Sequence, residues 1–175
     1  MSNKEKIIQS ALELFAKNGY TETSIDKIAK HAGVSKGLTY THFENKEELL
    51  LVTIEETIRQ LATGMLDVEE LNFKNFFEEY FNTLRVNTHL IRLCLLLVIH
   101  PQTPSNIFKI LNEQKKGFST ILVSLLQNQF NENAENEAEI LGATFDGITI
   151  AYVTNPNLIN LEIIQQYLTD KYYLA

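Results

Sequence analysis

The chain has 175 residues, of which 45% are hydrophobic, and a formal net charge of −7 at pH 7. This size suits one or two small globular domains, and the single cysteine, Cys94, excludes a disulfide within the chain. The N-terminus has no apolar signal core, and the most hydrophobic stretch, residues 93–99, is too short to span a bilayer. These features exclude a small protein stabilised by internal disulfide bonds and predict a cytoplasmic protein.

Charged residues are distributed unevenly along the chain. Residues 1–46 contain seven Lys/Arg and five Asp/Glu and carry +2, whereas the remaining residues contain eight and 17 and carry −9. The net charge argues against a nucleic-acid partner, but this distribution places a mildly basic part at the N-terminus of an acidic body. Such an arrangement orients a protein on DNA through one end and discourages binding elsewhere on its surface.

Residues 4–18 are predicted to form the first helix. Ile8, Ala11, Leu12 and Phe15 recur at helical spacing and give it one apolar face. Gly19 follows at a position where helices commonly end. We expect this helix to pack across the two short helices that come next, which completes a three-helix head.

Residues 24–42 have the pattern of two short helices joined by a tight turn. Apolar residues at 25, 28, 29 and 32 share one face of the first, and Thr23 or Ser24 can cap it, with Thr23-x-x-Asp26 fitting a capping box. Gly33 stands where a helix ends in a left-handed residue, and Ser35 can cap the second helix. Two helices around such a turn make a helix-turn-helix, whose second helix can enter the DNA major groove.

Polar residues of the second helix suit contacts with DNA. Lys36 and Leu38 can face base edges, and Gly37 lets the backbone come close to the duplex. Tyr40 and Lys46 can contact phosphates. The alternative is a helical hairpin whose polar residues are only solvated. The candidate DNA contacts are Thr23, Ser24, Ser35, Lys36, Gly37, Leu38, Tyr40, Thr41, His42 and Lys46.

An ordered series of residues runs through the first fifty positions: Phe15, Gly19, Tyr20, Thr23, Ile28, Ala29, the run 32–37, Tyr40, Phe43, Lys46, Glu47 and Leu50. This series resembles the DNA-binding domain of the TetR/AcrR family of bacterial transcriptional regulators. Two positions depart from the family pattern, because Thr39 stands where the family usually has a large apolar residue and Thr41 where it often has a ring. Thr39 bears on the packing of the head, and Thr41 on the operator sequence.

Helical periodicity continues through the rest of the chain. Asn45 can cap a helix over residues 46–66 that links the head to the body, and the polar residues 67–72 are predicted as a loop. Further helices are predicted from residue 73, over 89–99, from 104 to 130, and over 134–153 and 157–173. We therefore predict an all-α fold of about nine helices, with a DNA-binding domain over residues 1–46 and a ligand-binding and dimerisation domain over 47–175.

Aromatic residues form a stripe at helical spacing on the helix that begins at residue 73. Such a stripe is first of all core, and the sequence does not say which rings also line a pocket. His89, Arg92 and His100 are either surface and helix-end residues or groups that orient a ligand. The family resemblance implies a pocket among the middle helices, with candidate contacts Phe76, Phe77, Tyr80, Phe81, His89, Arg92, Leu95 and His100.

Small residues recur every four positions in the penultimate helix, at 143, 147 and 151. They place little bulk on one helix face and allow another helix to come close. By resemblance to the family, the last two helices form a homodimer. The candidate dimer contacts are Ile140, Ala143, Gly147, Ile148, Ala151, Leu161, Ile164 and Leu168.

Catalytic chemistry has little support in the sequence. The four histidines show no metal-ligand spacing with Cys94 or the carboxylates, and there is no glycine-rich phosphate loop or nucleophile elbow. We therefore expect no catalytic site, metal or cofactor. The predicted function is a repressor that binds a palindromic operator as a homodimer and is released by a small, largely apolar molecule. The alternative is a helical small-molecule-binding or scaffolding protein whose helix-turn-helix no longer reads DNA.

Overall fold

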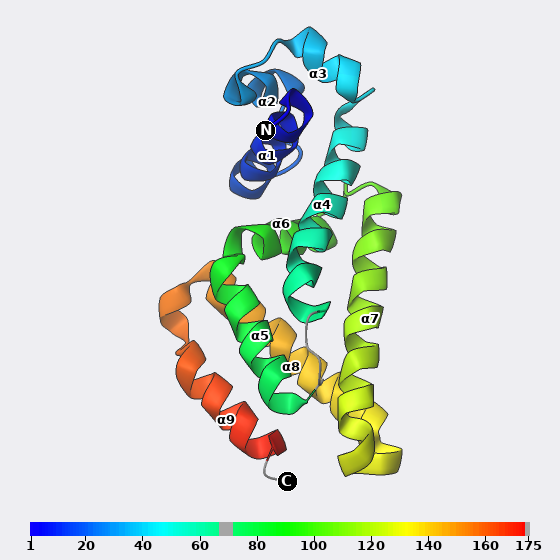
Figure 1. Cartoon of the computed structure of the whole chain (residues 1–175), viewed down its shortest axis with the longest axis vertical. Coiled ribbons are helices and arrows are strands. Elements are labelled where there is room, and N and C mark those ends of the chain that lie inside the picture. The colour runs from blue at the N-terminus through cyan, green and yellow to red at the C-terminus, as the bar shows by residue number, and fades with distance from the viewer. Residues whose placement is uncertain (67–71, 174–175) are drawn as a thin grey trace. The chain divides into compact units, whose positions relative to one another are not determined.

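The computed structural model describes residues 1–66 and 72–173, except for the side chains of residues 62–66 and 173. Over these residues the chain forms nine α-helices and two short 3₁₀ segments without a strand, so the predicted all-α class is confirmed. The helices, labelled in Figure 1, are α1 Asn3–Asn18, α2 Ile25–Ala32, α3 Lys36–His42, α4 Lys46–Leu66, α5 Phe73–Val86, α6 Thr88–Ile99, α7 Ser105–Phe130, α8 Ala134–Thr154 and α9 Leu161–Tyr173.

Residues that contact one another in space group into two compact units. The first contains residues 1–61 and 89–110, and the second contains residues 62–88 and 111–175. The predicted DNA-binding domain, residues 1–46, lies within the first unit, and its boundary after residue 46 stays a prediction. Helices α4 and α7 each have residues in both units.

Helices α1, α2 and α3 form a three-helix head around a small apolar core (Figure 1). Phe15 from α1, Ile28 from α2 and Phe43, which follows α3, are all buried. Thr39 on α3 is buried as well, and its hydroxyl donates a hydrogen bond to the backbone oxygen of Ser35 at 3.4 Å. A bond back into its own helix lets a threonine occupy an apolar position. The departure from the family pattern at this position is thus accommodated locally.

Helix α4 begins where the sequence predicts, because Asn45 Oδ1 accepts a hydrogen bond from the backbone N–H of Glu48 at 2.9 Å. Its buried face carries Leu50 together with two threonines, Thr53 and Thr57. The hydroxyls of these threonines donate to backbone oxygens four residues earlier, at 2.6 and 2.8 Å. The same back-bonding as in α3 therefore satisfies the polar groups that α4 buries.

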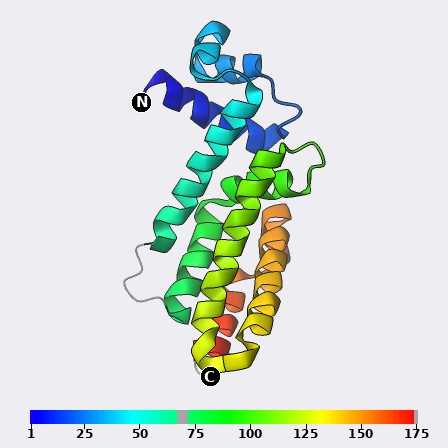
Figure 2. The same ribbon diagram turned by 90° about the vertical axis from the view of Figure 1, so that its right-hand side faces the viewer.

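Aromatic rings form the core of the second unit. The Tyr80 ring on α5 lies 4.2 Å from the Phe145 ring on α8, centroid to centroid, and the Phe76 ring lies 5.6 Å from the Phe118 ring on α7. A further ring of α5 contacts Tyr172 on α9. Figure 2 shows α5, α7 and α8 running alongside one another in this unit. The prediction that the aromatic stripe belongs to the core is confirmed by its burial.

Two helices begin later than predicted. Helix α9 starts at Leu161 rather than at residue 157, because Pro156–Leu158 form a 3₁₀ turn and Asn160 Oδ1 accepts from the backbone N–H of Ile163 at 3.2 Å. Helix α7 starts at Ser105 rather than at residue 104, and the hydroxyl of the preceding Thr103 donates to the backbone oxygen of Leu97 at 2.7 Å. Of the predicted loop over 67–72, residues 67–71 lie outside the described residues, and residue 72 caps α5.

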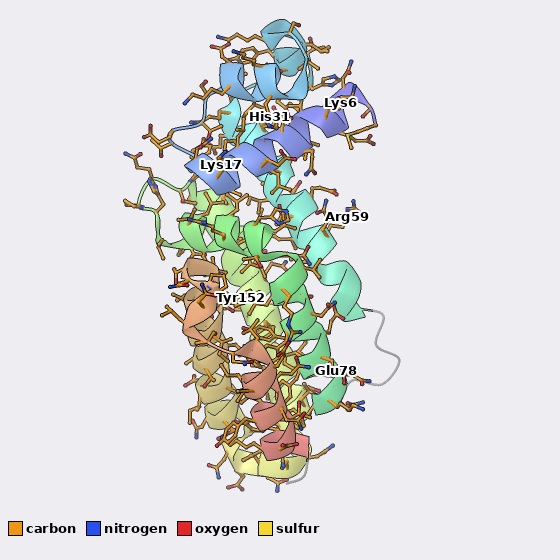
Figure 3. The ribbon with its side chains drawn as sticks, turned by 90° about the vertical axis from the view of Figure 1, so that its left-hand side faces the viewer. Lys6, Lys17, His31, Arg59, Glu78 and Tyr152 are labelled. Carbon is orange, nitrogen blue, oxygen red and sulfur yellow. The ribbon has the colours of Figure 1, made fainter. Side chains whose placement is uncertain are left out.

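Exposed charged side chains lie along the outside of the helices, as Figure 3 shows for Lys6 and Lys17 near the two ends of α1. Among the described residues, no single helix is both long enough and apolar enough to cross a membrane. In the same part of the chain, no group of three His, Cys, Asp or Glu side chains is placed to hold a metal ion.

Candidate nucleic-acid interface

Helix α3 has one exposed face, which carries most of the predicted DNA contacts. Ser35 fixes the start of the helix, because its Oγ accepts a hydrogen bond from the backbone N–H of Leu38 at 3.1 Å. Phe43 and Thr39 hold the opposite face in the core of the head. The exposed face consists of Lys36, Gly37, Tyr40 and Thr41, with Leu38 and His42 half-buried at its edge.

Gly37 is not required by packing within the chain. A Cβ at this position would meet only Ser35 Oγ, at 4.0 Å. Glycine inside a helix costs about 0.5–1 kcal/mol relative to alanine, and no positive φ calls for it here. A bare backbone on an exposed face fits a surface that another molecule approaches closely, as the sequence predicts for DNA.

The amino group of Lys36 is paired within the head. Its Nζ lies 2.9 Å from Oδ2 of Asp26 on α2, and both side chains are more than half exposed. The hydrogen bond to Asp26 raises the pKa of Lys36, so the amine remains charged at neutral pH. Sequence reasoning missed this pairing because the two residues are ten positions apart on different helices, and no local pattern signals such a contact.

Thr23 is not a surface residue, so its prediction as a DNA contact is wrong. Its side chain is fully buried, and its hydroxyl lies 2.8 Å from the backbone oxygen of Gly19 and 3.2 Å from that of Leu14. Its backbone N–H donates to the oxygen of Tyr20 at 3.3 Å, so the predicted capping box with Asp26 does not form. Thr23 therefore stabilises the turn between α1 and α2.

Ser24, the alternative cap, does cap α2. Its Oγ accepts from the backbone N–H of Lys27 at 3.3 Å, and the residue stays exposed. The helix it starts ends at Gly33, whose φ of 68° is left-handed as predicted. DNA contacts by Ser24 and by the residues of α3 stay predictions.

Lys46 has partners inside the head. Its Nζ donates to the backbone oxygen of Tyr20 at 2.9 Å, lies 3.4 Å from that of Thr21, and stands 4.3 Å from the centroid of the Tyr20 ring. Partial burial lowers the pKa of Lys46. The first residue of α4 is thereby tied to the turn between α1 and α2. This structural role was not predicted, and the predicted phosphate contact remains untested.

The eight residues predicted to bind a ligand have different surroundings. The four aromatic ones, Phe76, Phe77, Tyr80 and Phe81, are buried in the second unit. The hydroxyl of Tyr80 donates to the backbone oxygen of Phe145 at 3.0 Å and lies 2.6 Å from Thr149 Oγ1. The other four belong to the first unit, where Leu95 is half-buried and His89, Arg92 and His100 are exposed. Ligand binding by these residues stays a prediction.

Helices α8 and α9 leave large apolar side chains in solvent within the second unit. On α8, Ile140 and Ile150 are 59% and 51% exposed, and on α9, Ile163 and Tyr167 are 66% and 67% exposed. Gly147 lies on the same side of α8 by helical spacing, and a Cβ there would meet nothing within 4 Å. We call this set the α8–α9 face.

Only part of the predicted dimer set lies on the α8–α9 face. Ile140, Ala143 and Gly147 are exposed, whereas Ala151 and Ile164 are half-buried. Ile148, Leu161 and Leu168 are buried within the chain, so the predicted dimer contacts of these three side chains are wrong. They pack against the chain's own core. Three exposed apolar residues of this face, Ile150, Ile163 and Tyr167, were not in the predicted dimer set.

The N-terminal part of the chain is similar to known regulators. The family model described as "Bacterial regulatory proteins, tetR family" matches residues 7–53. The HTH-type transcriptional regulator YerO of Bacillus subtilis (strain 168) is 45% identical over 67 residues, which cover 38% of this chain and 23% of that protein. The matched part of the chain therefore spans less than a quarter of the length of YerO.

Similarity to two other proteins extends over most of the chain. The fatty acid metabolism regulator protein of Bacillus subtilis (strain 168) is 26% identical over 174 residues, covering 89% of this chain and 86% of that protein. The crystal structure of a transcriptional regulator from Aquifex aeolicus VF5 is 25% identical, covers 99% of both chains and superposes with a TM-score of 0.79. The fold described above is thus that of known transcriptional regulators.

Proposed function

Since the chain belongs to the TetR/AcrR family of bacterial transcriptional regulators, we propose that it is a cytoplasmic repressor that binds a palindromic operator as a homodimer. A small, largely apolar molecule releases it from the operator. The observation that supports DNA binding most directly is the exposed face of α3, which combines a cation, a bare glycine and a phenol on the second helix of a helix-turn-helix.

Three residues of that face, Lys36, Gly37 and Tyr40, have distinct roles in the proposal. Lys36 donates to a base edge, most favourably to guanine O6 or N7, and Tyr40 donates to a phosphate. Gly37 allows the α3 backbone to approach the duplex. Two copies in a dimer place two such helices one DNA turn apart, about 34–36 Å, which requires an operator with two-fold symmetry.

The test of this assignment is selection of duplexes from a random library by the wild-type chain and by Lys36→Ala. We expect Lys36→Ala to enrich a different sequence, because a base-edge donor contributes roughly 1–3 kcal/mol of discrimination at one position. Tyr40→Phe is the comparison, since loss of a phosphate donor weakens binding to all sequences alike. If Lys36→Ala enriched the same sequence with the same affinity, α3 would not be the recognition helix.

The proposed homodimer uses the α8–α9 face. Large exposed apolar side chains on adjacent helices are the usual mark of a protein–protein contact. Gly147 adds a second argument, because an exposed glycine inside a 21-residue helix destabilises that helix, and nothing within the chain requires it. A partner helix that crosses closely at this point explains the glycine. A two-fold axis at this contact would make it self-complementary.

The proposed effector carries a long apolar chain. The supporting observations are that similarity to the fatty acid metabolism regulator covers 89% of this chain and that the core of the second unit is aromatic. The test is titration of a long-chain fatty acid with and without operator DNA. Coupling of about 1–3 kcal/mol lowers operator affinity roughly 5- to 150-fold, and operator DNA must weaken effector binding by the same factor. Equal effector affinity in both titrations would exclude that compound as the effector.

A further inference from the structure

The ion pair between Asp26 and Lys36 joins the first helix of the helix-turn-helix to the second. We infer that Asp26 is a specificity-determining residue for DNA, because its carboxylate holds the Lys36 amine until a base edge offers the amine acceptors in fixed geometry. This inference rests on the proposed function. Asp26 was not among the residues that the sequence singled out for DNA binding.

The Asp26 carboxylate is free to take this role because it has no part in capping α2. Ser24 caps the helix, and the Thr23 N–H that a capping box would offer to Asp26 is bonded to Tyr20 instead. The acidic group also faces no packing constraint, since its side chain is 62% exposed. Lys36 Nζ, at 2.9 Å, is the contact that positions it.

Pairing changes what Lys36 contributes to each kind of DNA. On non-specific duplex, exchange of one anionic oxygen, the carboxylate, for another, a phosphate, would gain little free energy, so the amine stays on the carboxylate. On the operator a purine edge offers acceptors in fixed geometry, and the lysine contributes to discrimination between bases. The carboxylate therefore suppresses binding to wrong sequences more than binding to the operator, which is how competing contacts generate specificity.

The test compares Asp26→Asn with the wild type on two duplexes: the one that the wild-type chain selects from a random library, and a scrambled duplex of the same composition. We expect Asp26→Asn to tighten binding to the scrambled duplex more than to the selected one. A freed cation adds about one phosphate contact, so the logarithmic salt slope on scrambled DNA should steepen by ~0.9. Between 50 and 200 mM salt, the affinity of the variant should therefore fall by an extra factor of about 3.5.

Two control variants separate this pairing from a general charge effect. Glu44→Gln makes the same change in net charge at another exposed carboxylate of the head, and Lys36→Met removes the amine. The specificity ratio is the affinity for the selected duplex divided by that for the scrambled one. In the Lys36→Met background Asp26→Asn should leave this ratio unchanged, because a double-mutant cycle isolates the interaction between the two residues. Thermal melts of each variant establish that the head remains folded.

The outcomes are distinct from those of the proposed function. Failure of the wild-type chain to bind any duplex would remove the proposed function itself. Binding by the wild type, with Asp26→Asn indistinguishable from Glu44→Gln in specificity ratio and salt slope, would overturn only the role of Asp26. An equal effect of Asp26→Asn with and without the Lys36 amine would do the same, because it would mean direct repulsion between Asp26 and DNA.

Discussion

Gly147→Arg tests the proposed dimer at the point where two chains should approach most closely. Within one chain the substitution meets no steric obstacle, because a Cβ at Gly147 meets nothing within 4 Å. In a dimer closed by the α8–α9 face, it buries an unpaired guanidinium from each copy. One uncompensated buried charge costs about 3–5 kcal/mol, which raises the dimer dissociation constant about 10²- to 10⁴-fold.

Gly117 on α7 provides a matched control for this experiment. It is also an exposed glycine within a helix of the second unit, and a Cβ there likewise meets nothing within 4 Å. Sedimentation velocity of Gly147→Arg at micromolar concentration should show monomers with strongly reduced operator binding, whereas Gly117→Arg should remain dimeric. A Gly147→Arg variant that sediments as a dimer and binds operator normally would place the dimer interface elsewhere.

Three further predictions concern single side chains. Lys46→Met should lower the melting temperature by about 2–4 °C, because it removes an amine bonded to two backbone oxygens. An unchanged melting temperature, together with a salt slope of DNA binding reduced by about one, would instead identify Lys46 as a phosphate contact. Tyr80→Phe removes the buried hydroxyl that donates to the Phe145 oxygen and should lower the melting temperature by roughly 1–6 °C, unlike Tyr152→Phe in the same unit. Burial raises the pKa of Cys94 to about 12, so its thiolate fraction at pH 8 is roughly 10⁻⁴. Alkylation by iodoacetamide within tenfold of the rate for free cysteine would contradict this raised pKa.

The head could be predicted in detail because its signals are local. Ser24, Gly33 and Ser35 each act within four residues of their own position, as caps or as a left-handed turn. The buried face of α1 follows from spacing within one helix. Such patterns depend only on the geometry of neighbouring residues, so they can be recognised without knowledge of the tertiary structure.

The errors concern side chains whose role depends on a distant part of the chain. Thr23 looks like a polar surface residue until the oxygens of Leu14 and Gly19 are placed beside it. Ile148 and Leu168 have the same spacing as exposed residues of their helices, and only packing against the other helices decides which face is buried. Lys46 likewise acquires partners from a turn 25 residues earlier. Periodicity identifies an apolar face but not what covers it.

The measurement that tests the central claim most directly is recovery of genomic DNA fragments from the source organism by the purified chain, followed by sequencing. The account predicts enrichment of a palindromic sequence whose half-sites lie about one helical turn apart, and loss of that enrichment in Gly147→Arg. It also predicts that Lys36→Ala changes the enriched sequence. No enrichment at low salt, from a chain that melts cooperatively, would contradict DNA-binding regulation and favour a helical binding protein whose helix-turn-helix no longer reads DNA.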